Sequence, residues 1–146
     1  MEAWLERLSE AGHRITEPRQ AVMTVLQRTE RPLRPQEILE HGTALHTNLG
    51  LVTIYRTLEL FEQLGLVRRV HRGEGCHGYL PISPGHRHVL VCQACGRAVE
   101  FVGSDDLDTL IARVEAETDF QVTDHLLQLF GHCSDCRQVS NDLRGS

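Results

Sequence analysis

Apolar residues recur every three or four positions through residues 1–64, which is the spacing of amphipathic helices. Four such runs are present, and a glycine or a proline follows each of them, where it favours the end of a helix. The sequence therefore predicts four helices, at residues 2–11, 16–29, 35–41 and 50–64.

After residue 65 the pattern changes to the alternation that is typical of β-strands. Residues 66–72 and 76–82 form two such stretches, and Gly-Glu-Gly at 73–75 predicts a turn between them. A hairpin that directly follows a helix-turn-helix is a wing, and proteins with a helix-turn-helix place its second helix in the major groove of DNA. We therefore predict a winged-helix DNA-binding domain at residues 1–82.

The net charge of −5 is unevenly distributed, because the first 72 residues carry ten arginines and nine acidic residues, whereas the rest carry five and eleven. All 15 basic residues are arginine, whose forked guanidinium binds phosphates and base edges. The outer face of the fourth helix and the arginines around it are predicted to contact DNA, through Arg14, Arg19, Thr53, Tyr55, Arg56, Arg68 and Arg69. The alternative is a charged face that only water covers.

The Ser-Pro-Gly sequence at 83–85 predicts a hinge, and a second pattern follows it. Alternating residues predict strands at 86–91, 97–102, 120–124 and 126–130. A helix capped by Ser104 is predicted between them, with its apolar face turned inward through Leu107, Leu110, Ile111 and Val114. We therefore expect a small α/β domain at residues 86–146, whose exposed sheet edge favours pairing with a second copy. The chain as a whole is predicted to be α+β.

Two Cys-x-x-Cys pairs, Cys92/Cys95 and Cys133/Cys136, lie in this second domain. Four thiolates complete the tetrahedral set that structural zinc prefers and leave no position open for water or substrate. Two disulfides or two redox pairs are the alternatives, but no secretory signal is present and reducing compartments keep thiols free. The pattern predicts a zinc site that contributes to folding. Cys76 lies outside it and is expected to be a small buried residue or a spare thiol.

Four segments of the chain resemble the ferric uptake regulator family: residues 14–22, 53–58, 86–101 and 130–136. The resemblance implies a homodimeric, metal-responsive transcription factor with a winged helix at its N-terminus and a dimerisation domain after it. In that family, bound metal fixes both DNA-binding domains on a palindromic operator, usually for repression. The expected partners are double-stranded DNA and a second copy of the chain, in the cytoplasm, with no membrane and no small organic substrate.

The resemblance also implies a regulatory metal site at His86, His88, Asp108 and His125, with Glu100 as an auxiliary ligand. His86 and His88 project from one face of the predicted strand, so their imidazoles can share an ion. Zn²⁺ or Fe²⁺ is the expected metal, with Mn²⁺ as a further alternative. The histidine at position 88 resembles zinc-sensing members, which favours zinc.

A second site of the family, between the two domains, is not matched in this sequence. Arg87, Val89, Pro81 and residues 31–32 occupy the positions where its ligands are expected, and only Glu100 is retained. A one-residue bulge before Cys92 would shift the register and restore part of this site.

Two other functions are considered. The first is a regulator of the same fold that responds to peroxide or manganese, or no longer senses metal, which the lost ligands favour. The second is a zinc hydrolase or deaminase, which is disfavoured because four cysteines close the site and the His-x-Glu pattern of zinc deaminases is absent. We therefore expect a regulator and not an enzyme.

Overall fold

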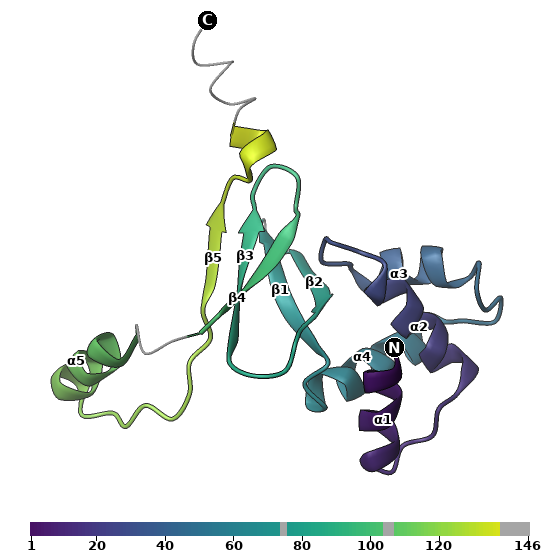
Figure 1. The fold of residues 1–146 in the computed structure, drawn as a ribbon, viewed down its shortest axis with the longest axis horizontal. Helices are drawn as coiled ribbons and strands as arrows, with labels where there is room; N and C mark the ends of the chain where they lie inside the picture. The colour runs from purple at the N-terminus through teal and green to yellow at the C-terminus, as the bar shows by residue number, and fades with distance from the viewer. Residues whose placement is uncertain (74–75, 104–106, 138–146) are drawn as a thin grey trace, which may run out of the picture.

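The computed structural model describes residues 1–73, 76–103 and 107–137 of the 146-residue chain. Four helices and a strand pair form the first part of the molecule, and a three-stranded sheet with a fifth helix forms the second (Figure 1). This arrangement confirms the predicted α+β class. Among the described residues, no helix is long and apolar enough to cross a membrane.

All four predicted helices are present, as α1 (Glu2–Glu10), α2 (Glu17–Gln27), α3 (Pro35–Gly42) and α4 (Leu51–Gln63). Local capping explains where α2 and α3 begin. The Thr16 hydroxyl accepts a hydrogen bond from the Arg19 N–H at 3.4 Å, and Pro18 lies in the first turn of α2. Pro35 opens α3, where its missing N–H costs nothing because the first N–H groups of a helix have no partner within it.

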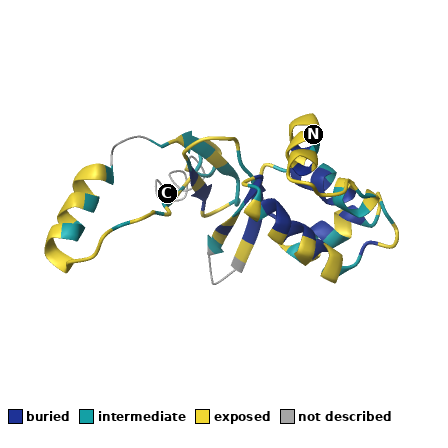
Figure 2. Ribbon diagram, turned by 90° about the horizontal axis from the view of Figure 1, so that it is seen from below, coloured by how far each residue is buried: buried dark blue, intermediate teal, exposed yellow. Residues whose placement is uncertain are grey.

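The core of the molecule lies among these helices, as the dark blue interior in Figure 2 shows. The Trp4 ring packs edge-on against Phe61, with ring centroids 5.3 Å apart. Complete burial is shared by Leu8, Val22, Met23, Leu26, Ile38, Ile54, Leu58 and Phe61. Each such side chain contributes about 1.5–3 kcal/mol when it leaves water, and three of them belong to α4. The core therefore fixes the orientation of that helix.

The predicted hairpin is formed by β1 (Val67–Gly73) and β2 (Cys76–Pro81), which pair antiparallel. Leu33 extends the pair at its outer edge, because its N–H and C=O exchange hydrogen bonds with those of Tyr79 at 3.0 and 2.8 Å. Backbone hydrogen bonds thus attach the hairpin to the helical part. The turn at residues 74–75 and the side chain of Cys76 lie outside the described part of the structure.

The second part is a sheet with the strand order β4-β3-β5. β3 (Arg87–Cys92) pairs antiparallel with β4 (Ala98–Val102) and parallel with β5 (Gln128–Gly131). The connection from β4 to β5 carries α5 (Asp108–Thr118), which stands away from the sheet (Figure 1). The predicted cap at Ser104 falls outside the described residues.

Two predictions for the second part are wrong. Residues 120–124 form neither strand nor helix, and Phe120 is 73% exposed. A strand must pair its N–H and C=O groups. This segment, which follows the left-handed Asp119 at the end of α5, has no strand beside it in the described part of the chain. The expected inward face of α5 is also wrong, because no residue of this helix is buried and Leu110 is 44% exposed (Figure 2).

The two parts meet where the hairpin packs on β3. Val70 and Leu80 of the hairpin form a small buried cluster with Val89 and Val91 of β3. The β3–β4 pairing runs without interruption from Arg87↔Val102 to Val91↔Ala98. No bulge shifts the register before Cys92, so the side chain of Val89 stays in this cluster and is not replaced by a metal ligand.

Candidate metal centres and nucleic-acid interface

The four predicted cysteines come together at one end of the sheet. Cys92 ends β3, Cys95 lies in the turn towards β4, and Cys133 and Cys136 lie just after β5. Their sulfur atoms all lie within 4.8 Å of one another, and Cys95 Sγ is 3.8 Å from Cys133 Sγ. Tetrahedral zinc with Zn–S bonds of ~2.3 Å separates its sulfurs by roughly 3.8 Å. All four thiols are free, so this group fits zinc and the alternative of two disulfides is wrong.

Hydrogen bonds prepare this group for metal. The N–H groups of Cys95 and Cys133 point at Cys92 Sγ and lower the pKa of the Cys92 thiol to about 5. Hydrogen bonding to Cys133 and to the other sulfurs raises the pKa of the Cys136 thiol to about 12. Zinc displaces the proton of a thiol such as Cys136 when it binds, because the ligand is the thiolate.

Three of the predicted histidines form a second group. His86 precedes β3, His88 lies within it and His125 belongs to the segment that leads into β5. His86 Nε2 lies 3.2 Å from His88 Nε2 and 3.0 Å from His125 Nε2. Tetrahedral Zn–N bonds of about 2.0–2.1 Å place their nitrogens roughly 3.3 Å apart. Three imidazole nitrogens aimed at one point fit a transition metal and leave a fourth position open.

Burial favours the neutral form of the central imidazole. His88 is 5% exposed and packs against the Phe101 ring on β4, with ring centroids 5.4 Å apart. Burial lowers the pKa of His88, and the neighbouring His86, His125 and Arg68 lower it further. A neutral imidazole is the form that binds metal. A pocket of about 550 Å³ opens beside the three rings, with Arg68 and Asp124 in its lining.

The structure does not bring the two predicted carboxylates into this group. Asp108 is exposed at the first residue of α5, outside the cluster of atoms that surrounds His86. Glu100 instead accepts hydrogen bonds from the Ser83 N–H at 2.7 Å and the Ser83 hydroxyl at 2.8 Å. Glu100 therefore ties the start of the predicted hinge to β4.

Gly103 is a site residue that the sequence did not reveal. Its N–H donates to the His86 carbonyl at 2.7 Å, and a Cβ atom on it would lie 1.7 Å from Cδ2 of the His86 ring. Only a residue without a side chain leaves room for His86 as it stands. Spacing alone carries no such signal, because Gly103 contacts the ring only after the β3–β4 hairpin has formed.

The predicted reading residues lie on the outer face of α4. Thr53, Tyr55 and Arg56 are exposed, whereas Ile54 between them and Thr57 after them are buried. Val52 is also 64% exposed on this face, and it was not predicted. The helix begins directly after Gly50, so these residues occupy its first two turns.

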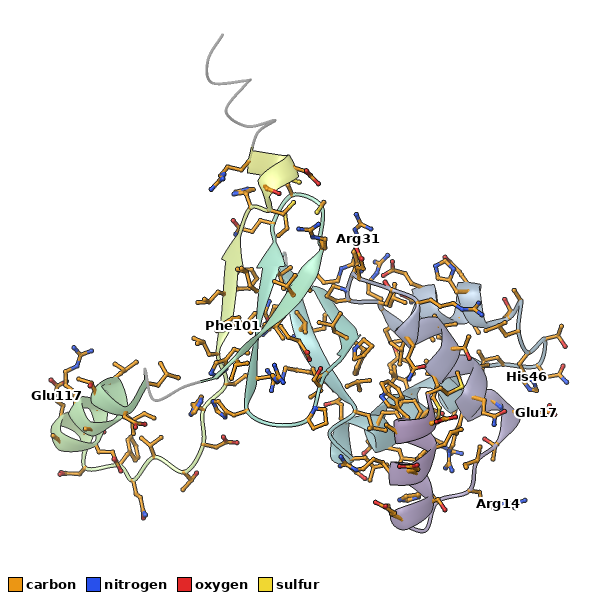
Figure 3. The ribbon with its side chains drawn as sticks, viewed as in Figure 1. Arg14, Glu17, Arg31, His46, Phe101 and Glu117 are labelled. Atoms are coloured by element: carbon orange, nitrogen blue, oxygen red, sulfur yellow. The ribbon has the colours of Figure 1, made fainter. Side chains whose placement is uncertain are left out.

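The predicted phosphate-binding arginines are in two different situations. Arg14 is exposed in the loop before α2 (Figure 3), and the Arg19 guanidinium donates to its carbonyl at 2.5 Å. On the hairpin, Arg69 Nη2 lies 3.4 Å from Glu62 Oε1, and Arg69 Cζ lies 5.7 Å from the centre of the Tyr79 ring. Arg68 turns towards the second part and donates to the Arg87 carbonyl at 2.7 Å. The hairpin arginines thus have partners within the chain.

Comparison with known proteins identifies relatives that cover most of the chain. The model of the ferric uptake regulator family matches residues 10–130. The zinc uptake regulation protein of Mycobacterium tuberculosis is 36% identical over 130 residues, which cover 89% of this chain and 99% of that protein. The ferric uptake regulation protein of Legionella pneumophila is 36% identical over 138 residues, with 90% and 97% covered. A zinc uptake regulator solved with zinc and DNA has a TM-score of 0.79 over 96% of this chain and 94% of that one, at 16% identity, which shows the shared fold.

Proposed function

The chain belongs to the ferric uptake regulator family, and we propose that it is a zinc-sensing repressor whose sensor is the group of His86, His88 and His125. Family membership confirms the broader expectation of a metal-responsive transcriptional regulator that binds DNA and is not an enzyme. The four-cysteine group and the metal-binding regulators of similar structure support structural zinc and a second divalent metal.

The observation that carries the choice of zinc is the chemistry of the three-histidine group. His86 Nε2 lies 3.2 Å from His88 Nε2 and 3.0 Å from His125 Nε2, and no carboxylate belongs to the group among the described residues. Imidazole suits zinc and iron, whereas manganese prefers carboxylate and water. The spacing of the nitrogens matches the tetrahedral geometry that zinc prefers. The zinc uptake regulation protein among the relatives supports the same choice.

The histidines connect two segments that are distant in the sequence. His86 directly precedes β3, His88 lies within it, and His125 lies three residues before β5. Bound zinc would hold these three imidazoles in one arrangement. The three side chains would then hold the segment at 119–127 against the sheet. Zinc shifts the equilibrium between the free and the held segment to the extent that it binds the held form more tightly.

We also propose that each range of residues has the function that the sequence predicted for it. Residues 1–82 bind DNA, residues 83–85 act as a hinge, and residues 86–146 bind metal and pair with a second copy. A homodimer presents two α4 helices, which fits a palindromic operator in the cytoplasm. Thr53, Tyr55 and Arg56 read bases, and Arg14 and Arg19 contact phosphates. Arg68 and Arg69 reach DNA only if they leave their partners within the chain.

The experiment that tests this function removes exchangeable metal while the four-cysteine zinc is kept. Affinity for a duplex selected by the protein from a random pool is then measured against buffered free Zn²⁺, Fe²⁺ and Mn²⁺. We expect zinc to tighten binding by about 5- to 150-fold, the usual range of coupling between two sites. Activation by iron or manganese alone would reject zinc sensing, and binding that ignores all three would reject a metal sensor.

A paired variant assigns the effect to the site. His86→Ala with His125→Ala is expected to abolish the zinc response while leaving the cysteine zinc in place. His13→Ala with His41→Ala removes two exposed histidines from the helical part and serves as the matched control. An unchanged zinc response in the first pair would rule out the three-histidine group as sensor.

A further inference from the structure

The side chain of one glutamine makes two hydrogen bonds between the two parts of the molecule. The amide of Gln128 on β5 accepts a hydrogen bond from the His71 N–H at 3.0 Å, and it donates one to the His71 carbonyl at 2.8 Å. Gln128 and His71 are 57 residues apart in the sequence. The amide therefore pairs with one residue of β1 as a neighbouring strand would.

The geometry of the hairpin shows why His71 needs this partner. The N–H and C=O of one residue in an antiparallel pair point to the same side, and neighbouring residues alternate. His71 directs both groups at Gln128, so they point away from β2, and its cross-strand neighbour His77 is a non-hydrogen-bonded partner. Without Gln128, both groups would lie on an unpaired strand edge.

The two edges of the hairpin are held by different parts of the chain. On the outer edge, Leu33 pairs with the backbone of Tyr79 and belongs to the helical part. On the other edge, Gln128 pairs with the backbone of His71 and belongs to the metal-binding part. Gln128 therefore helps to fix the direction of the hairpin relative to the sheet.

Gln128 also lies between the two candidate metal groups along the chain. It follows His125 by three residues and precedes Cys133 by five, and it stands opposite Val89 in the parallel pairing of β3 with β5. Any change that orders the segment containing His125 acts on the strand that carries this amide. The positions where an interdomain metal ligand was expected hold Arg87, Val89 and Pro81 instead.

Other contacts between the described parts are apolar or consist of one hydrogen bond each, such as those from Arg68 to the Arg87 carbonyl at 2.7 Å and from the Ala98 N–H to the Glu30 carbonyl at 3.0 Å. The cluster of Val70, Leu80, Val89 and Val91 is apolar, and such contacts are not directional. Arg31 donates to the Cys95 carbonyl at 2.8 Å from the loop after α2, which links the helical part to the cysteine turn (Figure 3). A paired amide fixes both the distance and the register of the strands that it joins.

We infer that Gln128 is a positioning residue for DNA binding, through which the three-histidine group sets the orientation of the hairpin and of α4. This inference rests on the proposed metal-dependent DNA binding. Gln128 is expected to act through His71 without touching DNA or metal.

The test replaces Gln128 with methionine, which has the same length and makes neither hydrogen bond. Gln121→Met is the matched control, because Gln121 is an exposed glutamine in the same part of the chain. Amide exchange of His71, affinity for the selected duplex with and without zinc, zinc affinity and thermal unfolding are measured for both variants. Gln128→Glu is a second variant that keeps the acceptor for the His71 N–H and removes the donor to its carbonyl.

In Gln128→Met we expect the His71 amide to exchange about tenfold faster and the zinc-loaded protein to bind the duplex about tenfold more weakly, which matches the loss of two hydrogen bonds. Zinc affinity is expected to stay within about twofold of wild type, because no ligand is changed. Gln128→Glu is expected to keep His71 protected and still to lose duplex affinity. Gln121→Met is expected to match wild type in every measurement.

Two results would overturn the inference. The first is unchanged exchange at His71 in Gln128→Met. The second is faster exchange with duplex affinity equal to that of wild type, which would make the amide pair a local contact only. Failure of the proposed function is distinct, because wild type itself would then show no zinc-dependent duplex binding whatever the exchange at His71.

Discussion

The helical part and the metal-binding part of this protein are held together by different means. The helices surround a continuous apolar core that includes Phe61 and Leu58 (Figure 2). The three-stranded sheet buries Val89 and Val91 only against the hairpin, and α5 buries nothing. A unit this small does not gain enough from apolar burial to fold alone. The comparison indicates that apolar burial stabilises the first part and that metal binding stabilises the second.

The largest expected effect comes from breaking the four-cysteine group. In Cys133→Ser we expect the β3 and β5 amides to lose protection from exchange while those of α2 and α4 keep theirs. Structural zinc contributes on the order of 10 kcal/mol to small zinc domains, which exceeds what the small apolar cluster supplies. Hydrogen exchange with and without chelator measures this, and Cys76→Ser, outside the two pairs, is the control. Retained protection of β3 in Cys133→Ser would contradict the comparison.

The converse change removes the centre of the helical core. Phe61→Ala is expected to lower the free energy of unfolding by about 3–5 kcal/mol, because it leaves a cavity beside Trp4. Urea unfolding followed by the fluorescence of the single tryptophan reports this part directly. Zinc affinity at the cysteines should stay unchanged. A parallel loss of zinc affinity would show that the two parts unfold as one unit.

A smaller effect is expected at the three-histidine group. Gly103→Ala forces the exposed His86 ring to move, because the new Cβ would lie 1.7 Å from it. We expect zinc affinity at this group to fall about 10- to 100-fold, the range seen when the support of a ligand is lost, with little change in unfolding. Competition with a zinc chelator measures the affinity. Gly50→Ala, with nothing within 4 Å of its Cβ, is the control.

The smallest effect concerns an ion-pair cluster within the first part. Burial alone raises the pKa of Glu37, but hydrogen bonds from the Arg34 backbone and side chain and from Arg72 Nη1 at 2.5 Å outweigh it and lower the pKa. A lowered carboxyl pKa stabilises the fold above its ordinary value near 4.5 and loses this contribution as pH falls through the folded value. Glu37→Gln should cost about 1 kcal/mol at pH 7 and less near pH 3. Urea unfolding at both pH values measures this, and an equal cost at both would contradict it.

The helical part and the metal-binding part also differ in how well the sequence predicts them. Amphipathic periodicity and capping residues such as Thr16 and Pro35 predicted every helix of the first part within a few residues. Cysteine spacing predicted the zinc group, because each Cys-x-x-Cys pair brings its two sulfurs together without help from the rest of the fold. These signals are local, so no distant partner is needed to interpret them.

The wrong or missed features depend on a partner distant in sequence, and so does the position of Asp108, which stays a prediction. Asp108 lies outside the three-histidine group, because its position depends on where α5 docks, and α5 buries no residue. A strand at 120–124 would need a neighbouring strand, and none of the described strands lies beside it. The role of Gly103 follows from the β3–β4 hairpin, and that of Gln128 from its approach to β1. Neither contact has a local signature in the sequence.

The parallel pairing of β3 with β5 also sets an order of folding. The helices and the hairpin form from neighbours in sequence, whereas Cys95 and Cys133 must meet across 38 residues. Closing a loop of this length costs about 3 kcal/mol of chain entropy before any contact rewards it. During synthesis the DNA-binding part is therefore able to fold while the sheet waits for residues 128–136 to be made. In the function that we propose, zinc supply then governs when a newly made chain matures, as well as when a finished one responds.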